Sequence, residues 1–181
     1  MNQGRGGYVG NQRREEILSL LTKSKKPVTG SYLARHFGVS RQVIVQDIAL
    51  LRARGLDIVA TSQGYMFGQA HDRPTVTRRL ACRHTPRETR AELLAIVQAG
   101  CRVVDVIVEH PLYGEIRGLL LLETEADVEE FIERYQSQGA QLLLTLTGGV
   151  HLHTIEADNP AVFEKVEDGL RELGFLLEEG E

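Results

Sequence analysis

Residues 31–54 read SYLARHFGVSRQVIVQDIALLRAR and predict two helices joined by a very short turn. The first helix is predicted over Ser31–Phe37, and Gly38 ends it because glycine readily takes the left-handed conformation of a C-cap. Ser40 is a typical N-cap, so the second helix is predicted to run from there to about Arg54. A spacing of two residues between the helices is typical of a helix-turn-helix.

The flanking sequence adds a third helix and a hairpin to this pair. A preceding helix is predicted over about Asn11–Ser24, because its apolar residues recur at helical spacing and Pro27 follows as a break. Residues Asp57–Phe67 hold two short runs of strand-forming residues around a polar turn with a glycine, which predicts a β-hairpin. The first domain is therefore predicted to be a winged helix-turn-helix over residues 8–68.

The second helix of the pair is the predicted DNA-reading element. The short turn fixes the two helices at a steep angle, so that the N-terminal end of the second can enter a major groove. Arginine pairs bidentately with guanine and glutamine with adenine, and amides at a helix start suit phosphates. For any one of these side chains the alternative is a solvated helix face. The candidate DNA-binding residues, two of them at the wing tip, are Ser40, Arg41, Gln42, Gln46, Ser62 and Gln63.

Charge is divided unevenly along the chain. Residues 1–70 hold ten Lys and Arg against four Asp and Glu, whereas residues 71–181 hold eleven against twenty-one. A basic N-terminal part followed by an acidic remainder indicates that the first part meets a polyanion and the second does not. The predicted partner is double-stranded DNA carrying an operator.

The compartment is predicted from what the sequence lacks. No apolar run approaches the roughly 20 residues of a membrane-spanning helix, and the N-terminal residues lack the apolar region of a secretory signal. Cys82 and Cys101 show no paired spacing, which suits free thiols in a reducing compartment. We expect a cytoplasmic protein with no membrane partner.

The N-terminal pattern resembles known regulators. Residues 13–67 resemble the winged helix of biotin-repressor-type regulators, through Val39-Ser40-Arg41, Asp47-Ile48 and Gly64-Tyr65. More narrowly, residues 40–52 (SRQVIVQDIALLR) followed by ATSQGY at 60–65 resemble the nicotinate-responsive repressors of NAD biosynthesis and niacin uptake. Those repressors join this module to a three-histidine (3H) domain.

The C-terminal part is predicted to be an α+β sandwich. Its elements alternate as β-α-β-β-α-β with an added strand and helix, which indicates a ferredoxin-like α/β sandwich over residues 75–178. The capping residues Thr85, Pro86 and Glu88 specify the start of its first helix. Strands are predicted over Val76–Arg83, Arg102–Glu109, Ile116–Leu122, Leu142–Thr147 and Val150–Glu156, and helices over Arg87–Ala99, Glu125–Gln138 and Pro160–Leu173.

Three histidines and a glutamate of this domain form a candidate metal set. His151 and His153 lie two apart on a predicted strand, so their side chains leave the same face. His84 precedes a helix on which Glu92 lies about two turns later, so both can reach one point. Three nitrogens and one carboxylate suit zinc, nickel, iron or another divalent transition metal. The alternative is a set of surface side chains, and the nearby thiol of Cys82 could compete as a ligand.

The resemblance to the 3H repressors covers about residues 13–173 and implies the same site. The family pattern places a histidine before a capped helix, a glutamate eight positions later and an HxH strand near the end, and each position is filled here. The family loop resembles residues 109–115 (EHPLYGE), which implies that His110 and Tyr113 belong to the effector pocket, with loop anchoring as their alternative role. It also implies a homodimeric repressor whose co-repressor is nicotinate, a pyridine carboxylate.

Two other functions stay open from the sequence. A repressor that responds directly to metal needs no organic effector. A hydrolytic metal centre would use a metal-bound water with Glu88, Glu109 or Glu115 as base. The sequence shows no nucleophile constellation or phosphate loop, so we expect a regulator and no catalytic residues.

Overall fold

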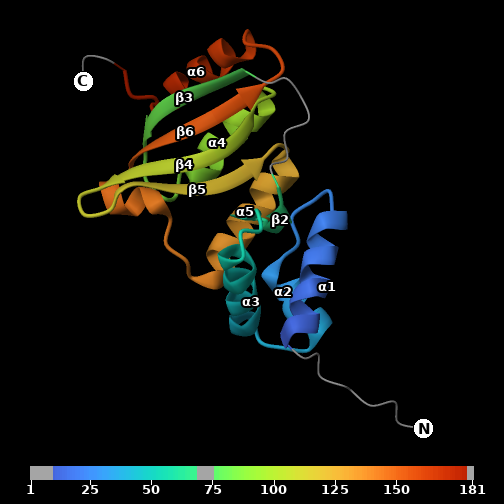
Figure 1. Cartoon of the computed structure of the whole chain (residues 1–181). Coiled ribbons are helices and arrows are strands. Elements are labelled where there is room, and N and C mark those ends of the chain that lie inside the picture. Colours follow the sequence, from blue (N-terminus) through green and yellow to red (C-terminus); the bar gives the residue numbers. More distant parts are fainter. Residues whose placement is uncertain (1–9, 69–75, 179–181) are drawn as a thin grey trace. The chain divides into compact units, whose positions relative to one another are not determined.

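The computed structural model describes residues 10–68 and 76–178 of the chain (Figure 1). The chain forms two compact units, residues 1–70 and residues 71–181, and each is considered by itself below. No helix in the part of the chain that the structure describes is both long enough and apolar enough to cross a membrane.

The first unit is the winged helix-turn-helix that the sequence predicts. Thr29 caps α2 by accepting a hydrogen bond from the Tyr32 N–H, and Gly38 ends that helix with a φ of 65°. Ser40 caps α3, where its hydroxyl accepts from the Val43 N–H at 3.3 Å. The elements are α1 (Gly10–Lys23), α2 (Gly30–Phe37), α3 (Arg41–Ala53), β1 (Ile58–Thr61) and β2 (Gly64–Phe67).

The wing is fixed against the start of α2 by a short backbone bridge. Strands β1 and β2 pair antiparallel, and Tyr65 exchanges two backbone hydrogen bonds with Val28. Gly64 has a φ of 136°, and a Cβ there would lie 2.5 Å from the Val28 carbonyl oxygen, so only glycine fits. A small apolar core lies under these elements and consists of Ile17, Leu21, Leu33, Phe37, Ile44, Ile48, Leu51 and Ile58.

The second unit is an α+β domain, as predicted. Its sheet has the strand order β3-β6-β4-β5, and every neighbouring pair is antiparallel. The second and fourth strands of the unit are central, whereas the first and third are central in a ferredoxin-like sheet, so the strand order departs from that arrangement. The elements are β3 (Val76–Arg83), α4 (Thr89–Gln98), β4 (Arg102–His110), β5 (Gly114–Leu122), α5 (Glu125–Gln138), the 3-10 helix η1 (Leu143–Thr147), β6 (Val150–Ala157) and α6 (Val162–Glu172).

One predicted strand of this unit is wrong. The segment expected to be a strand over Leu142–Thr147 is the 3-10 helix η1. The Thr145 hydroxyl donates to the Leu142 carbonyl and the Thr147 hydroxyl to the Leu144 carbonyl, at 2.7 and 3.2 Å. These local bonds compete with a sheet ladder for the backbone, which strand propensity alone does not reveal.

Helix α4 begins two residues later than predicted. The Thr85 N–H and hydroxyl both donate to the Glu88 carboxylate, at 2.8 and 2.7 Å. This ring closes a turn before the helix, and α4 starts at Thr89 with no side-chain cap. The capping residues are therefore engaged with each other, as expected, but one turn outside the helix.

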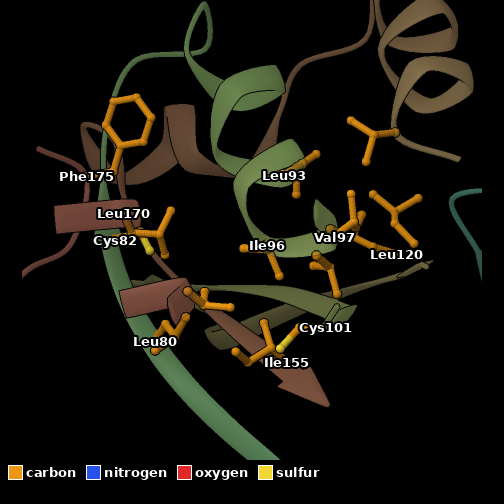
Figure 2. Close-up of a cluster of buried hydrophobic side chains, with 14 of the residues drawn as sticks. Leu80, Cys82, Leu93, Ile96, Val97, Cys101, Leu120, Ile155, Leu170 and Phe175 are labelled. Atoms are coloured by element: carbon orange, nitrogen blue, oxygen red, sulfur yellow. The ribbon is translucent and has the colours of Figure 1, made fainter. Parts of the chain in front are cut away.

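The core of the second unit lies between the sheet and its helices (Figure 2). Leu80 and Cys82 of β3 and Ile155 of β6 meet Leu93 and Ile96 of α4 in this cluster. Both cysteines are free and buried within it. Burial of the apolar face of α4 fixes the helix on the sheet, and with it the position of any polar side chain on the same face.

Candidate functional site

A cluster of buried polar side chains lies at the N-terminal end of α4. Glu92, in the first turn of that helix, is fully buried. His84 follows β3, while His151 and His153 point from β6 toward the same carboxylate. The four residues predicted as metal ligands are therefore brought together by three separate elements.

All three imidazoles reach the Glu92 carboxylate through Nε2. His84 Nε2 lies 2.6 Å and His153 Nε2 lies 3.3 Å from Glu92 Oε2, and His151 Nε2 lies 3.0 Å from Oε1. The ligand atoms of His84, Glu92 and His151 all lie within 4.8 Å of one another. Such proximity allows one ion to be held by several of these atoms.

The opposite nitrogen of each ring is held by the main chain. His84 Nδ1 lies 2.8 Å from the Thr85 carbonyl oxygen, and His151 Nδ1 lies 2.8 Å from the Gly149 carbonyl oxygen. His153 Nδ1 lies 2.5 Å from the Asp105 carbonyl oxygen. A carbonyl oxygen only accepts, so each Nδ1 carries the hydrogen. In the neutral rings the three Nε2 lone pairs then face a carboxylate, and each such contact requires a proton or a cation between the two atoms.

The pKa directions in the ion-free cluster agree with this geometry. Burial by itself raises the pKa of Glu92, but the charge of His153 and the hydrogen bonds from the three rings outweigh it and hold the pKa well below its usual range. Burial lowers the pKa of His84 and of His153, but the bonding and charge of Glu92 outweigh it, so both are raised. The cluster is thus organised around one buried negative charge that attracts positive charge.

The donor set fits a divalent transition metal. Metal-binding histidines characteristically donate their second ring N–H to a carbonyl or carboxylate, and all three rings do so here. Burial, followed by the charge of Glu92, raises the pKa of the Cys82 thiol, so the thiol stays protonated while the cluster is empty of metal. The thiol also hydrogen-bonds to Glu92, so it adjoins the cluster, and its competition as a thiolate ligand stays a prediction.

Two cavities adjoin the cluster. A cavity of about 30 Å³ is bounded by Glu92, His151 and His153 on its polar side. Its other lining residues are Thr89, Leu93, Val106, Leu120, Phe131, Leu142, Leu143 and Leu144. A more open cavity of about 570 Å³ is lined by His84 and also includes Arg83, Gly149 and Phe175 in its lining.

The structure does not bring the predicted effector residues to this cluster. His110 ends β4, and its Nδ1 accepts the backbone N–H groups of Leu112 and Tyr113, at 3.2 and 3.3 Å. Tyr113 is 72% exposed, whereas His110 is partly buried. Neither residue lines either cavity. This arrangement is the loop anchoring that the sequence left open as the alternative.

The three glutamates considered as catalytic bases are also outside both cavities. Glu88 is engaged with Thr85, while Glu109 and Glu115 are exposed partners across the β4–β5 hairpin. Nothing in their placement joins them to the Glu92 cluster, so the geometry gives no support to a hydrolytic centre that uses them.

In the first unit, the predicted DNA-binding residues lie at the start and on the exposed side of α3 and at the turn of the wing. Arg41, Gln42 and Gln46 are exposed on α3, and Ser62 and Gln63 form the turn between β1 and β2. Ser40 caps α3, so its position matches the expected role at the helix start. The exposed arginine and glutamines of α3 are side chains of the types that can read base edges in a major groove.

Sequence reasoning missed several residues that position the two sites. Asp47 is buried on the inner side of α3 and pairs with Arg13 Nε at 2.5 Å and Arg14 Nη1 at 3.1 Å on α1. Asp105 is fully buried, accepts the Thr154 N–H at 2.9 Å and pairs with Arg117. A single acid inside the apolar run of residues 103–108 (VVDVIV) was a signal for it. Thr89, which lines the small cavity beside the cluster, gave no such signal in the sequence.

Comparison with known proteins matches each of the two units to a protein family. Residues 77–179 match the 3H domain family and residues 13–66 match an HTH domain family. The probable transcription repressor NiaR of Thermotoga maritima is 48% identical over 172 residues, which are 95% of this chain and 97% of that protein. The transcription repressor NadR of Bacillus subtilis is 42% identical over 173 residues, which are 94% of this chain and 96% of that protein.

Proposed function

The chain belongs to the family of transcription repressors that join an HTH domain to a 3H domain, and from this premise we propose that nicotinate is its co-repressor, sensed at a metal in the C-terminal domain. The chain is accordingly a DNA-binding transcription repressor of NAD metabolism. We place the DNA-binding domain at residues 8–68 and the 3H regulatory domain at residues 75–178.

One observation carries the proposal of a metal. Three Nε2 atoms, each turned inward because its Nδ1 is held by a backbone carbonyl, meet at one fully buried carboxylate. Burying these polar groups without a cation is costly, while a divalent ion satisfies all four at once. We assign the ligands as His84, Glu92, His151 and His153, with zinc, nickel or iron as the metals whose preferences match.

The metal makes anion binding possible in an acidic domain. A divalent ion held by one carboxylate and three neutral imidazoles leaves the site with net positive charge, which attracts a carboxylate. The small cavity at the same cluster supplies mostly apolar walls, which suit a pyridine ring. Both features favour a pyridine carboxylate over a neutral or strongly hydrated ligand.

In the DNA-binding domain we assign the groove-facing role to α3 and the wing turn. Arg41, Gln42 and Gln46 supply base-reading side chains, and the amide groups capped by Ser40 supply a phosphate contact. We propose a homodimer in which effector occupancy favours the spacing of two such helices that matches an operator.

The test measures operator affinity in parallel states of the full chain. We expect nicotinate to raise the affinity of metal-loaded protein for its operator, and chelation to abolish that increase. Equal affinity with and without nicotinate, before and after chelation, would refute the proposal. An increase produced by metal alone, with nicotinate adding nothing, would instead identify a repressor that responds directly to metal.

A further inference from the structure

The hydroxyl of Thr89 is buried without a hydrogen-bond partner among the residues that the structure describes. Thr89 is 5% exposed, and its Oγ1 is one of few buried side-chain polar atoms left unpaired in the described ranges 10–68 and 76–178. Buried hydroxyls are normally bonded, because leaving one unpaired costs about 1–3 kcal/mol. An unpaired hydroxyl of this kind calls for a partner that the chain itself does not supply.

Thr89 lines the cavity that opens onto the Glu92 cluster. The same cavity of about 30 Å³ is bounded by Glu92, His151 and His153, so the unpaired hydroxyl and the candidate metal ligands share one space. A molecule bound next to the metal would therefore lie beside this hydroxyl.

The start of α4 makes this end of the cavity favourable for an anion. Thr89 is the first residue of the helix, whose first N–H groups have no acceptor within the helix. The preceding residue, Glu88, gives no side-chain cap because its carboxylate is bonded to Thr85. An uncapped helix start carries partial positive charge and attracts carboxylates.

The remaining walls require an apolar body. They come from α4, the sheet, α5 and the start of η1 with the residue before it, and none of them carries a polar side chain. They consist of Leu93, Val106, Leu120, Phe131, Leu142, Leu143 and Leu144. A molecule with one anionic end and a flat apolar ring satisfies both halves of the cavity.

The cavity admits such a molecule only if one wall moves. A volume of about 30 Å³ has room for little more than one or two waters. The wall formed by Leu142–Leu144 is short and is bounded by glycines with positive φ, 59° at Gly139 and 62° at Gly148. The strand pairing of the sheet does not involve Leu142–Leu144, so an outward shift of this wall leaves the sheet ladder intact. Such a shift has to carry or break the bond from the Gly149 N–H to the Leu144 carbonyl, at 2.9 Å.

We propose that Thr89 is the hydrogen-bond donor to the carboxylate of the effector, in a pocket that opens when the Leu142–Leu144 wall moves. This inference rests on the proposed function and adds a residue that discriminates ligands. It also places effector recognition at the start of α4 rather than on the hairpin that carries His110 and Tyr113.

The test uses a pair of valine variants in the full, metal-loaded chain. Thr89→Val keeps the shape and removes the hydroxyl. We expect it to weaken nicotinate binding about 10- to 100-fold, the range for one hydrogen bond to a charged group. Thr154→Val is the matched control, because Thr154 Oγ1 is also buried and unpaired but lines neither cavity. Thr89→Ser, which retains a hydroxyl, should bind nicotinate nearly as the parent chain does.

Titration calorimetry with nicotinate, metal affinity and unfolding temperature are measured for each variant. Metal affinity and unfolding temperature should not fall in Thr89→Val, because the hydroxyl makes no bond that the variant loses. Equal nicotinate affinity in Thr89→Val and the parent would overturn this inference and leave the proposed function intact. A fall in metal affinity together with nicotinate affinity, or an equal loss in Thr154→Val, would overturn it as well. Failure of the parent chain to bind nicotinate at all would overturn both.

Discussion

The carboxylate of Glu92 and the imidazoles around it determine how the second unit responds to pH. In the metal-free protein, the pKa values of His84 and His153 are raised above 6.5, so their contribution to stability is complete below that pH and is lost as pH rises through the raised values. The pKa of Glu92 lies below 4.5, so its contribution is present above that pH and is lost as pH falls through the lowered value.

We therefore expect opposite pH trends with and without metal. The metal-free second unit should be most stable between about pH 4.5 and pH 6.5 and should weaken toward pH 8. Metal binds the unprotonated Nε2 atoms, so the stabilisation that it adds should grow over the same rise in pH. Thermal unfolding from about pH 5 to pH 8, in chelator and in saturating nickel or zinc, measures both trends. Parallel curves would contradict the assignment of these histidines as ligands.

Replacing the central carboxylate tests the ligand set directly. Glu92→Gln keeps the size of the side chain but removes its charge, so we expect metal affinity to fall by more than about 100-fold, beyond the loss typical of changing a residue that only orients a ligand. Competition with a chromogenic chelator gives the affinity. Glu172→Gln, an exposed acid on α6, is the control and should bind metal as the parent chain does.

At the scale of elements, the backbone between η1 and β6 holds the Glu92 cluster in shape. Gly149 has a φ of 97°, and a Cβ there would lie 2.4 Å from the His84 carbonyl oxygen, while its own carbonyl accepts from His151 Nδ1. We expect Gly149→Ala to displace both histidines and abolish metal binding. Gly148→Ala meets nothing within 4 Å and has only the strain of its φ of 62°, so it should cost about 1–2 kcal/mol and still bind metal. Metal titration and denaturant unfolding of the two variants distinguish the outcomes.

The pairing of α1 with α3 gives a second prediction at this scale. Asp47 is buried between Arg13 and Arg14, so Asp47→Ala leaves two largely buried guanidinium groups without their partner. We expect a loss of about 3–5 kcal/mol in the stability of the first unit, measured by denaturant unfolding, with weaker operator binding. Asp57→Ala removes an exposed acid of the same unit and should leave both nearly unchanged. A similar loss in the two variants would show that the buried pairing is not responsible.

Local signals decided which elements could be predicted. Helices α2 and α3 have a capping hydroxyl, a left-handed glycine and apolar spacing that all agree, and their predicted bounds were close. For η1, apolar and β-branched residues predicted a strand, but the bonds of Thr145 and Thr147 to nearby carbonyls decided the outcome. The approach of His84, Glu92 and the HxH pair could be predicted from spacing and family pattern. The carbonyls that orient the rings could not, because a main-chain acceptor leaves no trace in residue identity.

For the whole molecule, two separate cores imply two unfolding events. The apolar clusters of the first and second units share no residue, and the Glu92 cluster belongs to the second alone. We expect calorimetry to resolve two transitions, of which only the one from the second unit shifts when chelator is added. A single transition that shifts as a whole would show that the units unfold together.

The charge division predicts in addition that operator binding weakens steeply with salt, as it does for a basic DNA-binding domain.

The carbonyls of Thr85, Asp105 and Gly149 that orient the three imidazoles have an evolutionary consequence. In centres where a carboxylate side chain orients each ring, one codon change can remove that support. Here the support belongs to the peptide backbone, so replacing the side chain of Thr85 leaves its oxygen in place, whereas at Asp105 the buried side chain also bonds the Thr154 N–H and helps to hold the chain path. The orientation of the rings therefore depends on the path of the chain, which at Gly149 admits only glycine, and much less on which side chain stands at Thr85.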